Sequence, residues 1–271
     1  MKMGLEIMDE IKQNYVANLV ASGKREDGRG FREFREISVE RGVAERAEGS
    51  ARVKIGDSDV LVGVKLDVGA PFPDTPNKGV IITNAELVPL ASPEFESGPP
   101  REDSVQLARV VDRGIRGSEA IDLERLCIEE GEKVWIVFID IHILDNGGNL
   151  VDAAALGAIS ALLNARIPFE KWGLPAPAGE GEEEEGRESS RLPIRETPVA
   201  VTTAKIEGKI LVDPNVNEEN AATTKLTVIS NADGSLSGMQ KSGSGGLKED
   251  EVLEMVELGI EKAGEIRENF L

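Results

Sequence analysis

The stretch that decides the fold is residues 134–168, VWIVFIDIHILDNGGNLVDAAALGAISALLNARIP. Alternate positions from Trp135 to Ile143 are apolar, which is the pattern of a strand with one buried face. The turn DNGG at 145–148 ends that strand, because Asn and Gly tolerate positive φ. Residues 149–165 are rich in Ala and Leu and contain no proline, so they predict an apolar helix. A glycine turn between strand and helix aims N–H groups outward, which suits phosphate binding.

Composition indicates a globular protein without a membrane span. The 271 residues are 40% hydrophobic and 30% charged, and they suffice for one large domain or two small ones. The longest apolar run lies in the strand above, is too short for a bilayer and contains Asp140. Residues 1–23 mix acidic residues with a helical apolar repeat, which predicts an amphipathic N-terminal helix rather than a signal peptide. A single cysteine excludes an internal disulfide framework and favours the cytoplasm.

The net charge of −19 opposes non-specific binding to nucleic acid, because the long-range field repels phosphates. A role in RNA binding therefore needs a local basic surface or a basic partner. The sequence shows no cluster of residues that demands a metal ion, and it predicts no cofactor.

Residues 24–88 are predicted to form a basic loop followed by strands. A turn at Asp27–Gly28 lies among five basic residues, and a solvated loop is favoured over a binding role for this segment: Lys24, Arg25, Arg29, Arg32 and Arg35. Strand patterns follow at 35–41, 50–56, 59–70 and 79–88, separated by Gly- and Asp-containing turns. Such spacing predicts an antiparallel sheet.

A two-faced helix is predicted over residues 104–117. At about 100° per residue, Arg113 and Arg116 fall within about 40° of Arg109, and the apolar residues fall on the opposite half. Asp112 lies beside this arginine stripe and is placed to pair with one of its members. A solvated face with local ion pairs is one interpretation of the stripe. Phosphate binding is the other, because the forked guanidinium matches phosphate oxygens.

The second half repeats the first in outline. Residues 169–195 are rich in Pro, Gly and Glu and predict an acidic linker. Strand patterns follow at 198–206, 209–213, 224–231 and 235–241. The chain then ends in a helix with an apolar stripe at Val252, Val256, Ile260, Ala263 and Ile266. Strands followed by a helix, twice, predict an α+β protein of two halves packed as one unit. The one histidine, His142, is interpreted as a structural hydrogen-bonding group.

Four segments together resemble the RNase PH family. They are REDGR at 25–29, the strand pair SARVKIGDSDVLVGVKLDVGAP at 50–71, ARVVDRGIR at 108–116 and DNGGNLVDAAALGAI at 145–159. The resemblance implies two βαβα-type halves related to the second domain of ribosomal protein S5, with domain 1 at 24–168 and domain 2 at 196–271. Members of this family form hexameric rings that degrade RNA from the 3′ end with phosphate and release nucleoside diphosphates.

Two departures from that family pattern concern its chemistry. Active members carry Gly-Ser/Thr-Arg in the phosphate loop, where this chain has Gly148, Asn149 and Leu150. Leucine neither donates a hydrogen bond nor balances a phosphate charge. Active members also carry an acidic pair near a metal ion, and Asn220, Thr224 and Lys225 occupy that region here.

Both departures resemble the non-catalytic ring subunits of the archaeal exosome. The resemblance implies an active sister subunit that alternates with this chain in a trimer of heterodimers, and RNA-binding cap proteins on the ring. It also implies that Arg109, Arg113 and Arg116 hold RNA phosphates at the subunit junction. Two alternatives stay open: an active phosphate-dependent exoribonuclease with its ligands elsewhere, and a purely structural ring spacer that never touches RNA.

Overall fold

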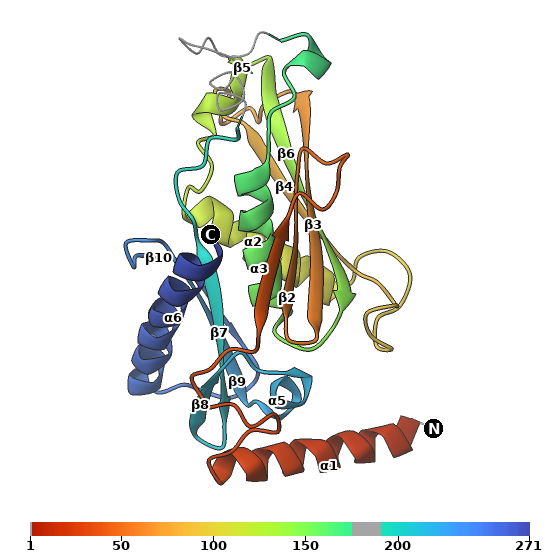
Figure 1. Cartoon of the computed structure of the whole chain (residues 1–271), viewed down its shortest axis with the longest axis vertical. Coiled ribbons are helices and arrows are strands. Elements are labelled where there is room, and N and C mark those ends of the chain that lie inside the picture. The colour runs from red at the N-terminus through yellow and green to blue at the C-terminus, as the bar shows by residue number, and fades with distance from the viewer. Residues whose placement is uncertain (1, 175–190) are drawn as a thin grey trace.

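The computed structural model describes residues 2–174 and 191–271, with side chains of the first helix described from residue 10. Figure 1 shows two sheets with helices packed between and beside them. The elements of the first half are α1 (Lys2–Ala21), β1 (Ile37–Arg41), β2 (Gly49–Ile55), β3 (Ser58–Gly69), β4 (Val80–Leu87), α2 (Glu102–Gly117), η1 (Glu124–Leu126), β5 (Cys127–Glu129), β6 (Lys133–Asp145) and α3 (Leu150–Asn164). Those that follow are η2 (Glu170–Trp172), β7 (Val199–Ile206), β8 (Lys209–Val212), α5 (Val216–Ala221), β9 (Thr224–Ser230), β10 (Leu236–Ser242) and α6 (Glu249–Phe270).

The first sheet is mixed rather than antiparallel. Its order is β1-β2-β3-β6-β4, with β5 paired to β6. The antiparallel prediction is right for β1, β2 and β3 but wrong for β4, which runs parallel to β6. The strand that comes last in sequence, β6, is inserted between β3 and β4, and α2 lies in the connection that leads back to it. A parallel pair requires such a long crossover.

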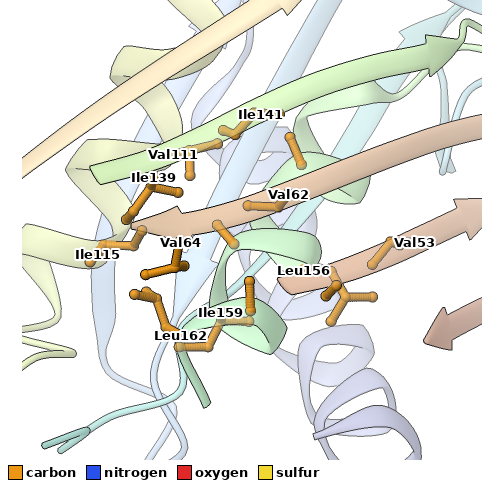
Figure 2. Close-up of a cluster of buried hydrophobic side chains, with 14 of the residues drawn as sticks. Val53, Val62, Val64, Val111, Ile115, Ile139, Ile141, Leu156, Ile159 and Leu162 are labelled. Carbon is orange, nitrogen blue, oxygen red and sulfur yellow. The ribbon is translucent and has the colours of Figure 1, made fainter. Parts of the chain in front are cut away.

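The core of the first half forms where α3 packs on the inner face of this sheet. Figure 2 shows Leu156, Ile159 and Leu162 of α3 directed toward valines and isoleucines of β2, β3 and β6, with α2 closing one side. Gly157 lies where a Cβ would meet Val62 Cγ2 at 2.8 Å, so glycine permits the close approach of helix and sheet. The alternating residues of the deciding strand are buried as predicted: Trp135, Val137, Ile139, Ile141 and Ile143.

The second sheet, in the order β10-β9-β7-β8, is covered on both faces. Ala200 and Ile229 face α2 and α3, whereas Leu226 and Val228 pack against α6. The molecule is therefore layered as sheet, helices α2 and α3, sheet, and helix α6 (Figure 1). Helix α1 runs along the end of the second sheet, where Val16 and Val20 contact β7 and β8.

The buried stripe of α6 differs from the predicted one. Met255, Leu258, Ala263 and Ile266 are buried, whereas Val252, Val256 and Ile260 are half-buried at the margin. The buried face is thus rotated toward Met255 and Leu258, because α6 must fit Leu226 and Val228 of β9. Ala263 and Ile266 belong to both the predicted and the observed face.

The two ends of the acidic segment 169–195 pack against the first half, and its part at 175–190 lies outside the described residues. The rings of Phe169 and Trp135 meet edge to face with centroids 5.7 Å apart. The backbones of Arg191 and Arg166 form an isolated antiparallel β-bridge, and Leu192 is buried. None of the helices in the described ranges is long and apolar enough to cross a bilayer.

Candidate functional site

A cleft of about 410 Å³ lies where α2, the start of α3 and the strands β9 and β10 meet. The α3 wall carries Leu150 and Val151, and the opposite wall carries Thr227 and Gln240. The three residues of the degenerate loop, Gly148, Asn149 and Leu150, thus lie at the wall of this cleft or directly beside it. Leu150 is half-buried and packs against the main core.

The glycine turn before α3 is held by the protein itself. The N–H of Gly147 donates to Ser58 Oγ at 3.1 Å, and that of Gly148 donates to Asn146 Oδ1 at 3.1 Å. Arg35 donates to the carbonyl oxygens of Gly147 and Gly148, at 2.7 and 3.1 Å. The expectation that this turn offers its amides to phosphate is therefore wrong for both glycines. Their N–H groups are already satisfied, and their carbonyls face a cation.

The backbone conformation of the turn suits the residue types found at positions 148 and 149. Gly148 has φ +89°, and a Cβ there would meet backbone atoms of Asn215 and Val216 at 2.5 Å. Asn149 has φ +55°, a left-handed conformation that Asn tolerates better than most residues. The turn therefore packs directly on the start of α5 in the second half.

Asn149 links two buried carboxylates. Its amide nitrogen donates to Asp152 Oδ2 and to Asp213 Oδ1, both at 2.8 Å. Asp152 in turn accepts from the backbone N–H of Thr202 at 2.8 Å, and its Oδ1 lies 2.7 Å from Thr202 Oγ1. The Thr202 hydroxyl lies 2.8 Å from that of Thr227. This chain of bonds joins α3 to β7 and β9 behind the cleft.

Burial raises the pKa of Asp152 to about 7, against the lowering effect of its hydrogen bonds to Thr202 and Asn149. Burial also raises the pKa of Asp213, but the hydrogen bonds and the charge of Arg35 outweigh it and hold that pKa below its usual value. Asp213 therefore stays ionised at neutral pH, whereas Asp152 takes up a proton near neutrality.

Replacing Asp152 by asparagine is expected to flatten the pH dependence of stability. Between pH 4 and 7 native Asp152 holds a proton that the unfolded chain releases, so its contribution to stability falls as pH rises through that window. The uncharged carboxamide can accept from Thr202 N–H and donate to Thr202 Oγ1. As pH rises from 5 to 8, the unfolding free energy of the variant should increase by about 2 kcal/mol relative to that of the wild type.

Urea unfolding at several pH values measures this difference, with the exposed Asp74→Asn as the matched control. Parallel stability profiles for Asp152→Asn and wild type would contradict the assignment of a proton to Asp152.

The solvated-loop interpretation of the basic segment 24–35 is right for the exposed Lys24 and Arg32 but wrong for its other three arginines, which form an ion-pair network. Arg25 forms two bonds to Glu218, at 2.6 and 2.8 Å, and neither side chain is exposed. Arg29 and Arg35 both pair with Asp213, at 2.9 and 2.7 Å. The segment lies between the two halves of the chain, where it contacts the carboxylates of Asp213 and Glu218. No local sequence signal predicts these partners.

The arginine stripe on α2 is exposed, as the angular spacing predicts. Arg116 pairs with Asp112 at 2.7 Å, which confirms the pairing expected for Asp112, and it also donates to the carbonyl of Ile81. Arg113 donates to Gln240 Oε1 at 2.7 Å, at the edge of the cleft. The side chain of Arg109 makes no hydrogen bond or ion pair within residues 2–174 and 191–271. Of the three arginines in the stripe, Arg109 and Arg113 therefore have no carboxylate paired with their charge among the described residues.

The positions of the family's acidic pair do not fit a divalent cation. Lys225 Nζ lies 2.6 Å from Glu219 Oε1, so an ammonium already neutralises the nearest carboxylate. Thr224 is buried and Asn220 is exposed at the end of α5. Within the described ranges no three His, Cys, Asp or Glu side chains gather as metal ligands.

His142 is half-exposed on the outer face of the first sheet rather than interior. Its Nδ1 lies 3.3 Å from Glu86 Oε2 on the neighbouring strand β4. This is a surface contact, and neither residue lines the cleft, in keeping with a structural role.

Comparison with known proteins places this arrangement in one family. The chain matches the description "3′ exoribonuclease family, domain 1" over residues 33–168 and "domain 2" of the same family over residues 196–262. It is 57% identical over 268 residues to "Exosome complex component Rrp42" of Methanocella arvoryzae, covering 99% of this chain and 98% of that protein. It is 51% identical to the protein of the same name from Archaeoglobus fulgidus, covering 98% of each.

Solved structures agree with that assignment. An Archaeoglobus fulgidus exosome with RNA bound to the active site contains a chain that superposes with a TM-score of 0.90 at 51% identity, covering 98% of this chain and all of that one. A chain of an archaeal exosome core superposes with a TM-score of 0.86 at 48% identity, covering 98% and 99%. The sequence, the two-sheet fold and the cleft at the seam agree: the chain belongs to the RNase PH family of 3′ exoribonucleases.

Proposed function

We propose that this chain is a non-catalytic subunit of the hexameric ring of an archaeal exosome. In that role it binds RNA and supports the active site of an RNase PH-type sister subunit during 3′-to-5′ phosphorolytic degradation. The sister alternates with it in a trimer of heterodimers, RNA-binding cap proteins sit on the ring, and the complex works in the cytoplasm. Support comes from near-full-length identity of 51–57% to proteins that carry the exosome name.

The observation that carries the non-catalytic part is Leu150 in the wall of the cleft. Phosphorolysis needs cationic or N–H groups aimed at phosphate oxygens, because the reaction develops and transfers charge there. The side chain of Leu150 supplies neither a cation nor a hydrogen-bond donor, the amides of Gly147 and Gly148 are used internally, and Lys225 is paired with Glu219. These features of the described residues support a cleft without its own phosphorolytic chemistry, and no three His, Cys, Asp or Glu side chains among them gather as metal ligands.

The arginine stripe supports the RNA-binding part. A chain with net charge −19 needs its cations gathered locally to hold a polyanion. Arg109 and Arg113 are exposed on one face of α2, beside the edge of the cleft. Contacts of guanidinium groups to phosphates carry no sequence information, as suits an exonuclease that must accept every sequence.

An activity assay with purified subunits tests the proposal. The chain alone, given RNA, phosphate and Mg²⁺, is expected to release no nucleoside diphosphates above the background of a heat-inactivated sample. Mixed with the sister subunit it should co-elute as one ring and yield processive release. Robust release by the chain alone would favour the alternative of an active enzyme, and failure to co-assemble would remove the ring role.

A further inference from the structure

Two arginines of the stripe on α2 are held by different kinds of acceptor. Arg116 pairs with the carboxylate of Asp112 at 2.7 Å. Arg113 Nη1 donates instead to the side-chain amide oxygen of Gln240, also at 2.7 Å. A carboxylate orients a guanidinium and cancels its charge, whereas an amide oxygen orients it and leaves the charge in place. The partner of Arg113 therefore fixes its direction without neutralising it.

The strand β10 brings Gln240 to Arg113 because it packs closely against α2. Gly117 of α2 leaves no room for a Cβ beside the carbonyl oxygen of Ser237, so glycine permits the close approach. A Cβ on Gly238 would lie 3.9 Å from Arg113 Cδ, so the stem of the arginine lies over this glycine. Gly238 and Gln240 are two positions apart and face the same side of the strand. The stem of Arg113 thus passes Gly238, and its guanidinium ends at Gln240.

The Gln240 side chain is itself held in place. Its Nε2 donates to the backbone carbonyl of Lys241 at 3.2 Å, and it is half-buried in the wall of the cleft. Arginine has only N–H donors, so the oxygen end of the amide must face Arg113. Arg113 is exposed, and the bond to Gln240 is its one side-chain hydrogen bond among the described residues. Its other N–H groups are therefore open to a ligand at the edge of the cleft.

We propose that Gln240 is a positioning residue for RNA binding, which holds the charged guanidinium of Arg113 at the edge of the cleft for a phosphate of the RNA chain. This role rests on the proposed function, because it concerns how the arginine stripe binds RNA. A side chain that is already oriented loses less conformational entropy on binding, so the held arginine binds a phosphate more tightly than a mobile one. A carboxylate at position 240 would keep the orientation and cancel the charge.

Substitutions at position 240 in the assembled ring separate orientation from charge. Gln240→Leu removes the acceptor and leaves the charge of Arg113, so RNA affinity should fall about two- to tenfold with an unchanged salt slope. Gln240→Glu pairs the guanidinium, so affinity should fall about three- to tenfold and the magnitude of the salt slope by roughly 0.7. Fluorescence anisotropy of a labelled single-stranded RNA at several salt concentrations measures both quantities. Wild-type affinity in both variants, or the same salt slope in both, overturns the proposal.

The matched controls are Gln13→Leu and Gln13→Glu on the exposed side of α1, and both should bind RNA as the wild type does. Gln240→Leu is also measured in the Arg113→Gln background, where it should have no further effect because the arginine that it orients is gone. An equal loss in both backgrounds means that Gln240 acts independently of Arg113 and overturns the positioning role.

The single variant Arg113→Gln distinguishes failure of this inference from failure of the proposed function. If Arg113→Gln weakens RNA binding while both variants at position 240 bind as the wild type does, the positioning role alone is overturned. If Arg113→Gln leaves RNA affinity unchanged, the contact of Arg113 with RNA is removed and the positioning role is overturned with it.

Discussion

Reversing the charge of Arg109 and Arg113 together is expected to weaken RNA binding by the assembled ring by about 10- to 100-fold. Both guanidinium groups are exposed on one face of α2, and Arg109 has no partner within residues 2–174 and 191–271. Each phosphate contact to single-stranded RNA releases counterions, so the loss of two contacts should lower the salt slope by roughly 1.4. Fluorescence anisotropy of a labelled RNA at several salt concentrations measures both quantities.

Charge reversal elsewhere is the control. Arg32 and Arg46 are also exposed, and Arg32→Glu with Arg46→Glu changes the net charge of the chain equally. The control ring should bind RNA nearly as the wild type does, because its new charges lie away from the stripe. If affinity and salt slope are unchanged in the Arg109 and Arg113 variant, the chain is a structural spacer that does not contact RNA.

Replacing Arg25 by methionine is expected to cost about 3–5 kcal/mol of folding free energy. The side chains of Arg25 and Glu218 are both fully buried and joined by two hydrogen bonds. Arg25 also donates to the carbonyls of Val212 and Asp213, at 2.9 and 2.8 Å. Methionine has similar length but leaves Glu218 buried without its counter-charge. Urea unfolding, with the midpoint shifted and the slope unchanged, measures the loss.

A second substitution separates the cost of the unpaired charge from the cost of lost packing. Adding Glu218→Gln removes the charge, so the double variant should regain a substantial part of the stability. Arg32→Met is the matched control. The Arg32 guanidinium lies 3.8 Å from the Glu254 carboxylate, and both side chains are more than half exposed, so the loss of this contact should lower the folding free energy by less than about 1 kcal/mol. A small effect of Arg25→Met, similar to that of Arg32→Met, would contradict the structural role of the buried pair.

Local patterns in the sequence predicted the helices and strands better than they predicted which strands and side chains pair with one another. The alternation from Trp135 and the Ala-rich run after Asn149 gave β6 and α3 within about two residues, because periodicity reports which face is buried. The parallel pairing of β4 with β6 was missed, because pairing depends on a distant strand. The angular position of Arg109 and Arg113 was predictable for the same local reason.

The interior ion pairs and hydrogen bonds between distant residues could not be predicted from such local patterns. Arg25 meets Glu218 across 193 positions of the chain, and Asn149 meets Asp213 across 64. A basic residue in a turn-rich segment has the same local signature whether it is solvated or buried against a carboxylate. Only the resemblance of REDGR to a known family marked this segment as distinctive.

The distance between Arg25 and Glu218 along the chain has a consequence for biosynthesis. At about 5–20 residues per second, the ribosome adds the residues between them in roughly 10–40 s. During that time the guanidinium of Arg25 has no carboxylate to meet and stays hydrated, and α1 has no second sheet to cover. The deciding strand and helix at 134–168 emerge well before that and can pack on β2 and β3. The N-terminal segment is therefore made first and docked last, when the C-terminal half emerges.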